Sequence, residues 1–530
     1  MCWNFSKKMV MVISLVTVMI IGLTGQVSGA ETLLRAVPVT SVNQLDPIWT
    51  TTIAVQIHGF MVYDTLFGLD EDFNVKPQMV DTYTVSSNKL VYTFTLRSGL
   101  KWHDGTPVTS KDCVASIKRW GAKDGIGLKL MAATQKLEVI DDKTFRLTLK
   151  EPFGMVLQGL GKVTVSVCFM MREKDAMTDP NQQVKEVIGS GPFKFVKEAF
   201  QPGVTAFYVK NDAYVPRKEP ASNMAGGKMV QVDKVELVWI PDPNTAANAL
   251  MSGEIDYIQT PSLDLIPKLK AAKGVKVEIN DPTGLQTVLR LNHQQPPFDN
   301  VKARQAVLWA TNMEDNLRAV TSDPTLFRVC PSMYPCGSVF ASDTGSEPLM
   351  KQDFEKAKQL LKEAGYKGEK IVLLHRNDEN IIFPQALVSG SNLRKAGFNV
   401  DMQGMDWSTM LSRRAVRKPA AEGGWHIFQT WFNGPDFLNP VEHVPIGAAC
   451  EKAWWGWPCD EEIEKLRAAF GRETDLEKQK EIAREVQKRA FEVVTYVPLG
   501  TVYQPVAYRS DRLEGLLKSP IPLFWNVRKK

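Results

Sequence analysis

The sequence predicts an α/β protein of two lobes, with a β-rich insertion in the first lobe. Two strand–helix–strand segments, over 234–259 and 370–403, predict sheets with parallel strands, because a crossover helix lets successive strands run in the same direction. The segments lie more than 100 residues apart, so we expect a separate sheet for each. Alternating apolar and polar residues between about 70 and 190 predict further strands. The 530 residues suffice for two or more domains.

The first strand–helix–strand segment has clear boundaries. The apolar run KVELVWI (234–240) ends at a proline, and Asp242 or Asn244 can cap the helix that follows. Gly253 ends this helix, because glycine readily adopts the left-handed conformation found just past helix ends. IDYIQ (255–259) then predicts the second strand.

The second segment repeats this order. KIVLLH (370–375) predicts a strand, a helix follows through ALVSGSNLRKAG to Gly397, and FNVDMQ (398–403) predicts the next strand. Between the two segments we expect long helices over 301–320 and 352–365. Two separate lobes accommodate these helices better than one sheet does.

The remaining segments complete the two lobes. LVYTFTLRSG and TFRLTLKEP alternate as half-buried strands do, which places the β-rich insertion in the first lobe. Residues 460–494 are predicted to be helical, with oppositely charged residues four apart on an exposed face. The apolar, β-like stretch 496–510 follows, and we expect it to return to the first lobe.

Residues 1–30 predict an export signal. Lys7 and Lys8 form a charged start, residues 9–25 form an uncharged apolar core, and Ser28 to Ala30 offer small residues to a signal peptidase. A retained membrane anchor is the alternative, because the core approaches the length that spans a bilayer. Cleavage near Ala30 removes two lysines and lowers the formal net charge from +5 to +3. This mild charge indicates no nucleic-acid partner. From the signal we expect an exported, soluble protein.

The cysteines fit an oxidising compartment, since six remain after the signal is removed. Spacing favours two local disulfides without fixing their connectivity. The candidate pairs are Cys330 with Cys336, and Cys450 with Cys459. Two others lie in apolar surroundings and are expected to be buried thiols, namely Cys113 and Cys168. The sequence has no C-x-x-C or H-x-x-x-H motif, so no metal site is expected.

The polar stretch LRSGLKWHDGTPVTSKDCVASIKRW predicts a turn and a capped helix rather than a catalytic site. Asp104 and the glycine after it are a strong turn pair, while Thr109 and Asp112 can form a capping box. His103 cannot pair with Asp104 as a catalytic dyad, because adjacent side chains in an extended segment point to opposite faces. The G-x-S-x-G motif is absent, so no catalytic residue is expected.

This stretch, with FTLRSGLKWHDG followed by PVTS and a helix, resembles bacterial solute-binding proteins of peptide-type and nickel-type ABC importers, the extracellular solute-binding protein family 5. Other segments agree in the family's order, and the resemblance covers nearly all of the mature chain. They are SVNQLDP (41–47), HGFMVYDTLF (58–67), KPQMVDTY (76–83), IGSGPFKF (188–195), IPDPNTAANALMSGEIDY (240–257), LNHQQPPFDNVKARQAV (291–307), LLKEAGY (360–366) and YVPLG (496–500).

The resemblance implies the two-lobed periplasmic binding protein fold, class II (cluster C), in which two strands cross between lobes that enclose the ligand. Residues 31–290 would then form lobe I, with its extra β-rich subdomain at about 70–190. Residues 291–500 would form lobe II, and residues 501–530 would return to lobe I.

The resemblance also implies a function. Such a protein is the periplasmic substrate-binding subunit of an ABC importer, and it delivers a peptide or similar small polar solute to inner-membrane permease subunits served by ATPases. A ligand that touches both lobes favours the closed state through its differential affinity. The subunit makes and breaks no bond and needs no cofactor, and we expect a monomer.

The resemblance points to GGWHIFQTWFNGPDFLNP (423–440) as the ligand-binding segment of lobe II. In peptide-binding relatives this segment carries a tryptophan and an aspartate that pairs with the ligand's amino terminus. Trp431 and Asp436 are the nearest candidates here, but the acid is out of register. Asn433 offers an uncharged amide instead, and Trp425 would share a face with Trp431 in a continuous strand.

Further aromatic residues complete the candidate site. Trp407 lies where a strand enters a helix, a position that approaches the ligand in relatives. From lobe I we expect Tyr63 and Trp49 to contribute, whereas Asp46 is interpreted as a turn residue. Three tryptophans in the Cys450–Cys459 loop offer large aromatic faces for the mouth of the cleft. They are Trp454, Trp455 and Trp457.

Other functions remain open at the level of sequence. The same importer class takes non-peptide solutes, so an opine, an oligosaccharide or chelated nickel is the alternative ligand. A secreted hydrolase is a rival of another class, for which no motif is present. A chaperone or adhesin-like role would use the same fold without transport.

Overall fold

The computed structural model describes residues 31–164, 166–377 and 379–530. The predicted export signal and its cleavage point near Ala30 lie outside these residues. Within the described part of the chain, no helix is both long enough and apolar enough to cross a membrane.

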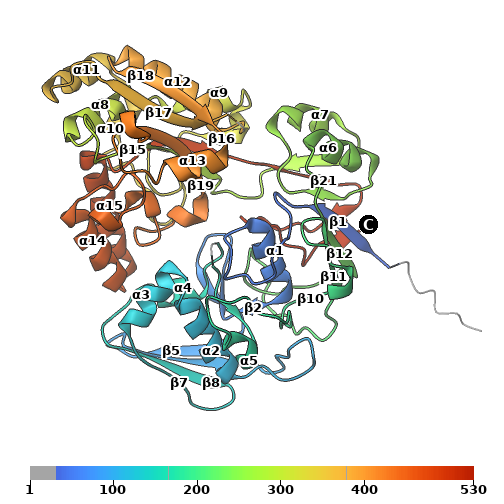
Figure 1. Cartoon of the computed structure of the whole chain (residues 1–530). Helices are drawn as coiled ribbons and strands as arrows, with labels where there is room; N and C mark the ends of the chain where they lie inside the picture. Colours follow the sequence, from blue (N-terminus) through green and yellow to red (C-terminus); the bar gives the residue numbers. More distant parts are fainter. Residues whose placement is uncertain (1–30, 165, 378) are drawn as a thin grey trace, which may run out of the picture.

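The first sheet has seven strands and carries the first predicted strand–helix–strand segment (Figure 1). Strand β1 pairs in parallel with β12 on one side and with β13 on the other. Helix α6 (Pro243–Ser252) connects β12 to β13, and Asp242 Oδ1 accepts from Thr245 N at 2.7 Å at its start. In spatial order the strands are β10 (Phe193–Phe195), β11 (Thr205–Lys210), β12 (Lys234–Val238), β1 (Leu33–Val37), β13 (Tyr257–Ile258), β21 (Val506–Arg509) and β14 (Val275–Glu278).

The second sheet has six strands and contains the second predicted segment. Strands β17 and β18 pair in parallel, joined by helix α12 (Ile382–Lys395), so this βαβ unit is confirmed. In spatial order the strands are β16 (Phe327–Arg328), β20 (Val497–Val502), β15 (Leu285–Leu291), β19 (Ile427–Asn433), β17 (Lys370–Arg376) and β18 (Asn399–Met405).

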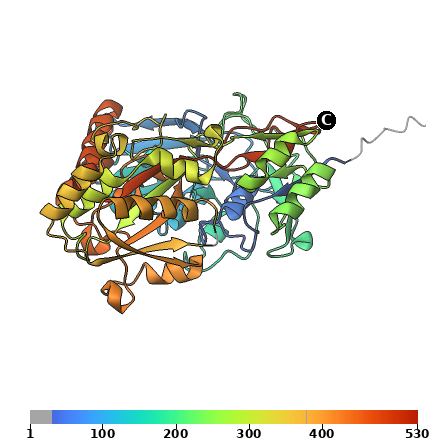
Figure 2. The same cartoon turned by 90° about the horizontal axis from the view of Figure 1, so that it is seen from above.

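The chain passes between the two sheets twice, at residues 279–284 and 503–505 (Figures 1 and 2). These crossings run side by side in opposite directions, since β15 pairs with β20 and β14 pairs with β21. Gly284, with φ +60°, ends the first crossing, and a Cβ there would lie 2.9 Å from the Val502 carbonyl oxygen. The close approach of the two crossings therefore requires glycine.

The crossings do not coincide with the predicted lobe boundaries. The boundary between 290 and 291 falls inside β15, and the one between 500 and 501 falls inside β20, so both strands belong to the second sheet. The stretch 496–510, expected to return to the first lobe, is divided between the two sheets. A continuous apolar sequence does not reveal at which residue a strand changes its sheet.

The β-rich insertion is a four-stranded antiparallel sheet packed against α2 (Ser110–Gly121) and α3 (Gly125–Ala133). The predicted capping box is present, because Asp112 Oδ2 accepts from Thr109 N at 2.7 Å. In spatial order the strands are β5 (Val80–Val85), β6 (Val91–Leu96), β8 (Thr144–Leu149) and β7 (Thr134–Val139).

The single helix predicted over 301–320 is wrong, because two helices occupy this range. Helix α8 (Val301–Ala310) ends before Asn312, whose side chain accepts from Asp315 N at 3.1 Å and starts α9 (Met313–Val320). Asparagine stabilises a new helix start in this way, although its neighbours continue the apolar pattern. The other predicted helical segments hold α11 (Phe354–Glu363), α14 (Glu461–Arg472) and α15 (Leu476–Val493).

Shorter elements fill the space around the sheets. They are α1 (Ile53–Val62), β2 (Asp64–Thr65), β3 (Phe67–Leu69), β4 (Val75–Pro77), α4 (Val156–Leu160), β9 (Phe169–Met170), α5 (Glu173–Ala176), α7 (Ile266–Ala271), α10 (Glu347–Met350), α13 (Trp407–Arg413), β22 (Leu513–Glu514) and β23 (Arg528–Lys529). Two disulfides join Cys330 to Cys336 and Cys450 to Cys459, whereas Cys113 and Cys168 are buried free thiols.

Candidate functional site

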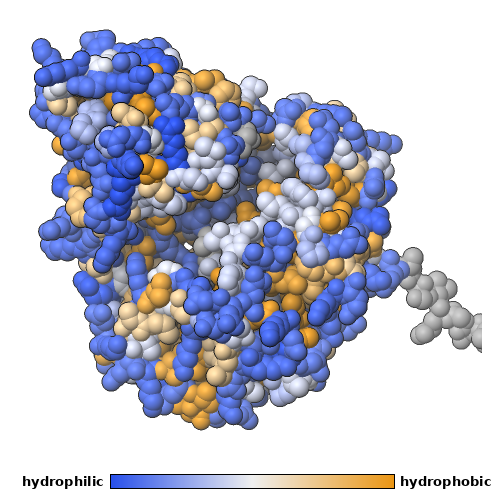
Figure 3. All heavy atoms as spheres, viewed as in Figure 1, coloured by the Kyte–Doolittle hydropathy of each residue, from blue (hydrophilic) through white to orange (hydrophobic). Residues whose placement is uncertain are grey.

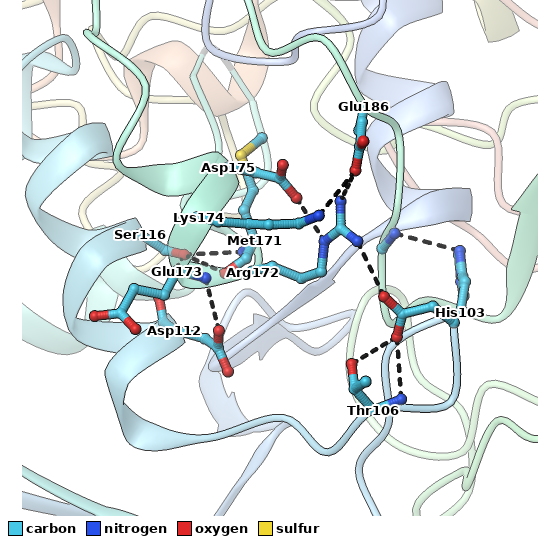
Figure 4. Close-up of polar contacts among 12 residues, drawn as sticks. His103, Thr106, Asp112, Ser116, Met171, Arg172, Glu173, Lys174, Asp175 and Glu186 are labelled. Atoms are coloured by element: carbon cyan, nitrogen blue, oxygen red, sulfur yellow. Dashed lines mark hydrogen bonds and ion pairs between the residues drawn. The ribbon is translucent and has the colours of Figure 1, made fainter.

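The polar stretch around His103 forms a turn, as predicted (Figure 4). His103 Nε2 lies 3.1 Å from the Gly191 carbonyl oxygen, and burial lowers the pKa of this histidine to about 4. Asp104 instead accepts from Thr106 N at 3.0 Å and pairs with Arg172 at 3.0 Å. The histidine and the aspartate therefore have separate structural partners and form no catalytic dyad.

A cavity lies where the two crossings meet both sheets, and we call it the hinge cavity. It encloses about 690 Å³ of empty space, part of it open to solvent. Figure 3 shows the surface hollowed between the two lobes. The residues that line the cavity come from lobe I, from both crossings and from lobe II, and they are Val39, Ile53, Tyr257, Gln259, Thr260, Asn280, Asp281, Gly284, Leu285, Trp431, Asn433, Gln504, Val506, Ser519, Pro520 and Pro522.

Two predicted site residues, Trp431 and Asn433, line the hinge cavity. Both belong to the last part of β19, where the strand leaves the core and its side chains become half-buried. Trp431 packs beside Leu285 and Ile382 on one side of the six-stranded sheet. Its ring is thus held by the core of lobe II while part of it remains available to a molecule in the cavity.

Sequence reasoning missed most of the polar residues of the hinge cavity, and two of these, Asp281 and Tyr257, have unusual surroundings. Asp281 Oδ1 accepts from Thr283 N at 2.8 Å and from Thr283 Oγ1 at 2.5 Å, and burial raises the pKa of this carboxyl to about 6. The Tyr257 hydroxyl is buried without a hydrogen-bond partner among the described residues. A turn sequence such as DPTG gave no sign that Asp281 faces a cavity.

A second cavity separates the β-rich insertion from lobe II, and we call it the insertion cavity. It encloses about 1310 Å³ of empty space, again partly open to solvent. Its walls are mostly apolar, formed by Leu69, Phe73, Val75, Met155, Leu157 and Val163 from lobe I and by Val339, Phe340, Leu438 and Leu476 from lobe II. The space between the lobes thus extends well beyond the hinge.

Asp436 connects the lobes beside the insertion cavity rather than lining the hinge cavity. Its Oδ1 accepts from Thr164 Oγ1 of the first lobe at 3.0 Å. Burial raises the pKa of Asp436 to about 6, although Thr164 and the nearby Lys162 favour the charged form. The carboxyl is therefore engaged with protein and poorly placed to receive a ligand's amine in the hinge cavity.

Lys162 forms a second polar connection between the lobes. Its Nζ lies 2.5 Å from Asp124 Oδ2 of the insertion and 3.5 Å from Glu442 Oε1 of lobe II. Burial opposes the charge on Lys162, but these two carboxylates prevail and raise its pKa above the ordinary value. Asp124 also caps α3, so the lysine joins a helix start of the insertion to lobe II.

Replacing Asp436 with asparagine should raise the free energy of unfolding at pH 7.5 by about 1 to 3 kcal/mol. The pKa of Asp436 is about 6 in the fold against an ordinary 3.8, so the stability that its protonation contributes is lost as pH rises from about 4 to about 6. Asparagine still accepts from Thr164 but carries no buried charge. Denaturant unfolding at several pH values measures this, and Asp315→Asn on the exposed start of α9 is the control. A variant less stable than wild type at pH 7.5 would contradict the argument.

Trp425 and Trp407 lie on another side of lobe II. Trp425 is fully buried, and its Nε1 donates to the Arg414 carbonyl oxygen at 3.0 Å. It precedes β19 and packs against Phe428, so it does not share a face with Trp431. Trp407 is half-buried, with the Arg414 guanidinium carbon 4.9 Å from its ring centroid. Neither is among the residues that line the hinge cavity.

The lobe I candidates also lie away from the hinge cavity. Tyr63 is buried against Phe169, with ring centroids 6.0 Å apart, and burial holds its pKa above the ordinary range. Trp49 is 39% exposed, and Lys123 Nζ lies 5.6 Å from its ring centroid. Asp46, interpreted as a turn residue, also pairs with buried Arg119 at 2.8 Å.

The tryptophans of the Cys450–Cys459 loop surround arginines rather than standing free. The Arg414 guanidinium carbon lies 4.0 Å from the Trp455 ring centroid and 5.7 Å from that of Trp454. Trp457 is buried and packs against Trp425. These contacts fix the loop on lobe II through cation–π attraction and apolar packing.

Comparison with known proteins agrees with this architecture. The family model of bacterial extracellular solute-binding proteins, family 5 Middle, matches residues 74–445. A probable peptide ABC transporter periplasmic-binding protein of Sinorhizobium fredii is 42% identical over 489 residues, which cover 91% of each chain.

Two solved structures share the fold. The Helicobacter pylori periplasmic binding protein DppA, in complex with the peptide STSA, has a TM-score of 0.75 at 23% identity and covers 94% of this chain and 98% of its own. The Agrobacterium tumefaciens protein AgaA, in complex with agropinic acid, has a TM-score of 0.71 at 23% identity and covers 94% and 99%. The predicted two-lobed α/β fold is confirmed, and the chain belongs to the bacterial extracellular solute-binding proteins, family 5.

Proposed function

We propose that this protein is the periplasmic substrate-binding subunit of an ABC importer and that it captures a peptide or similar small polar solute in the hinge cavity. The observation that carries this proposal is the origin of the cavity wall, which comes from both lobes and both crossings. The relative from Sinorhizobium fredii, described as a peptide transporter component, supports the same function.

The protein would bind its solute by closing its two lobes around it. The lobes that we propose to move relative to each other are residues 31–278 with 506–530, and residues 285–502. The main chain connects them through the two crossings. A ligand that contacts both lobes binds the closed arrangement more tightly and shifts the population toward it. Trp431 contributes a rigid aromatic face, which supplies contact area at small cost in conformational entropy.

Delivery of the solute completes the function. The closed protein would dock as a monomer on inner-membrane permease subunits, whose ATPases supply the energy for import. An export signal cleaved near Ala30 would place the protein in the periplasm. The family role is transport rather than catalysis, so we expect the solute to leave the protein chemically unchanged.

A non-peptide solute is the second candidate, with an opine, an oligosaccharide or chelated nickel as examples. One observation favours it, because Asp436 hydrogen-bonds Thr164 instead of facing the hinge cavity. The AgaA complex shows that this fold accommodates agropinic acid in another protein. A secreted hydrolase ranks below both candidates.

Mass spectrometry of small molecules released from purified protein identifies retained solute, and calorimetry with the refolded, ligand-free protein measures its affinity. The Trp431→Ala variant should bind the identified solute about 10-fold to 100-fold more weakly, because an aromatic side chain of the cavity wall is lost. Trp49→Ala is the matched control, since this tryptophan is exposed and does not line the cavity. Chemical conversion of the solute, or unchanged affinity in Trp431→Ala, would overturn the proposal.

A further inference from the structure

We infer that the hinge cavity recognises a protonated amine of its solute, with Asp281 as the group that pairs with it. This inference rests on the proposed binding function and adds the chemical class of the ligand. It assigns the acid to a crossing between the lobes, whereas the family resemblance gave Asp436, three residues after β19, as the candidate.

Charge in the hinge cavity is concentrated on a single side chain. Of the sixteen residues that line it, Asp281 alone is ionisable near neutral pH. The other polar groups are amides and hydroxyls, contributed by Gln259, Thr260, Asn280, Asn433, Gln504, Ser519 and Tyr257. A cavity with one carboxylate and otherwise neutral walls favours a cationic guest group over an anionic one.

Among the residues that the structure describes, the Asp281 carboxylate has no cationic partner. No lysine, arginine or histidine in the described ranges forms an ion pair with it. Its hydrogen bonds come from Thr283, two residues further along the same crossing, and they fix the direction of the carboxyl group. Burial disfavours its charge and raises its pKa to about 6, although hydrogen bonds from Thr283 and Gly284 favour the charged form. An ammonium group beside the carboxylate would offset the remaining cost of burying the charge.

Tyr257 gives an independent indication of a ligand contact. Its side chain is 1% exposed, and its hydroxyl finds no hydrogen-bond partner within the part of the chain that the structure describes. Buried polar groups without a partner are uncommon in folded proteins, because each costs free energy. Tyr257 and Asp281 line the same cavity, so a guest N–H group that reaches the Tyr257 hydroxyl when the lobes close would satisfy both.

Trp431 completes the arrangement from lobe II. Its ring lines the cavity that contains Asp281, and an indole face attracts a cation through its quadrupole. The ammonium group would therefore contact a carboxylate on the crossing and an aromatic ring on lobe II. A ligand that contacts both sides of the hinge binds the closed state more tightly than the open state and so favours closure.

The test uses the refolded, ligand-free full protein and calorimetry at pH 7.5 with matched probes. Trialanine and agmatine carry a protonated amine, N-acetyl-trialanine lacks it, and maltotriose and citrate represent neutral and anionic solutes. The wild type should bind an amine probe at least 30-fold more tightly than its neutral counterpart. Asp281→Asn should lose about that factor for the amine probe and stay within 3-fold for N-acetyl-trialanine.

Two further variants test the role of the Tyr257 hydroxyl and provide a surface control. Tyr257→Phe removes only the hydroxyl and should weaken amine binding about 5-fold to 10-fold. Asp315→Asn, on the exposed start of α9, should leave all affinities unchanged. Circular dichroism and thermal unfolding show that each variant is folded, and the asparagine at 281 still accepts from Thr283.

The outcomes separate the two proposals. If maltotriose, citrate or N-acetyl-trialanine binds as well as the amine probes, or if Asp281→Asn binds them like the wild type, the amine inference fails while the binding function stands. If no probe binds and purified protein retains no solute, the binding function fails together with the inference.

Discussion

Replacing Lys162 with methionine is expected to lower the free energy of unfolding at pH 7.5 by about 3 to 5 kcal/mol. The substitution leaves the carboxylates of Asp124 and Glu442 without the cation that lies between them. Both carboxylates are largely buried, so solvent compensates them poorly. Burial already raises the pKa of Glu442, and loss of Lys162 removes a group that lowers it. The glutamate then protonates more readily, and the loss should be smaller at pH 5.

Denaturant unfolding measures this effect, and small-angle X-ray scattering reports whether the insertion separates from lobe II. The control is Lys136→Met, which removes an exposed ion pair with Glu138 on β7 and should change stability by about 0.5 kcal/mol at most. A loss below about 1 kcal/mol for Lys162→Met at pH 7.5 would show that the buried contact adds little.

The Arg290→Met variant should lose about 3 kcal/mol of unfolding free energy. Arg290 is fully buried in β15 and donates to four backbone carbonyls, with Nε 2.6 Å from Trp455 O and Nη1 2.7 Å from both Pro445 O and Thr495 O. Nη2 donates to Trp454 O at 3.0 Å. Burial lowers the pKa of this arginine to about 9, yet its carbonyl partners would be left without donors if it were removed.

The same variant should release the Cys450–Cys459 loop, because two of the four carbonyls belong to it. Limited proteolysis should cut this loop faster, and tryptophan fluorescence should shift to longer wavelength. Arg318→Met is the control, since it removes an exposed ion pair with Glu314 on α9 and a cation–π contact with Phe327 but no buried hydrogen bond. Equal stability of Arg290→Met and wild type would refute the role assigned to the guanidinium.

Local sequence signals predicted much of the fold, because its elements end at residues with specific backbone chemistry. Asp242 and Gly253 bound α6 as expected, and Thr109 with Asp112 forms the expected capping box. The error at 301–320 has the same origin, since Asn312 is itself a helix cap inside a continuous apolar pattern.

The candidate site was only partly predictable. Trp431 and Asn433 were found because they follow an apolar strand that resembles the family's ligand-binding segment. Asp281 was missed because its neighbours make a turn, and only the pairing of the two crossings brings it beside Tyr257 and the end of β19. Burial of Trp425 depends on contacts with residues far along the chain, which periodicity does not reveal.

The adjacent crossings bring both ends of lobe II together. Residues 285–502 begin and end on neighbouring antiparallel strands, so the entry and exit points of this lobe are next to each other. Adjacent ends are what permit circular permutation and the transplantation of one domain into another. Recombination at the two crossings would exchange an entire half of the protein, and with it Trp431 and Asn433, while the other half kept Tyr257.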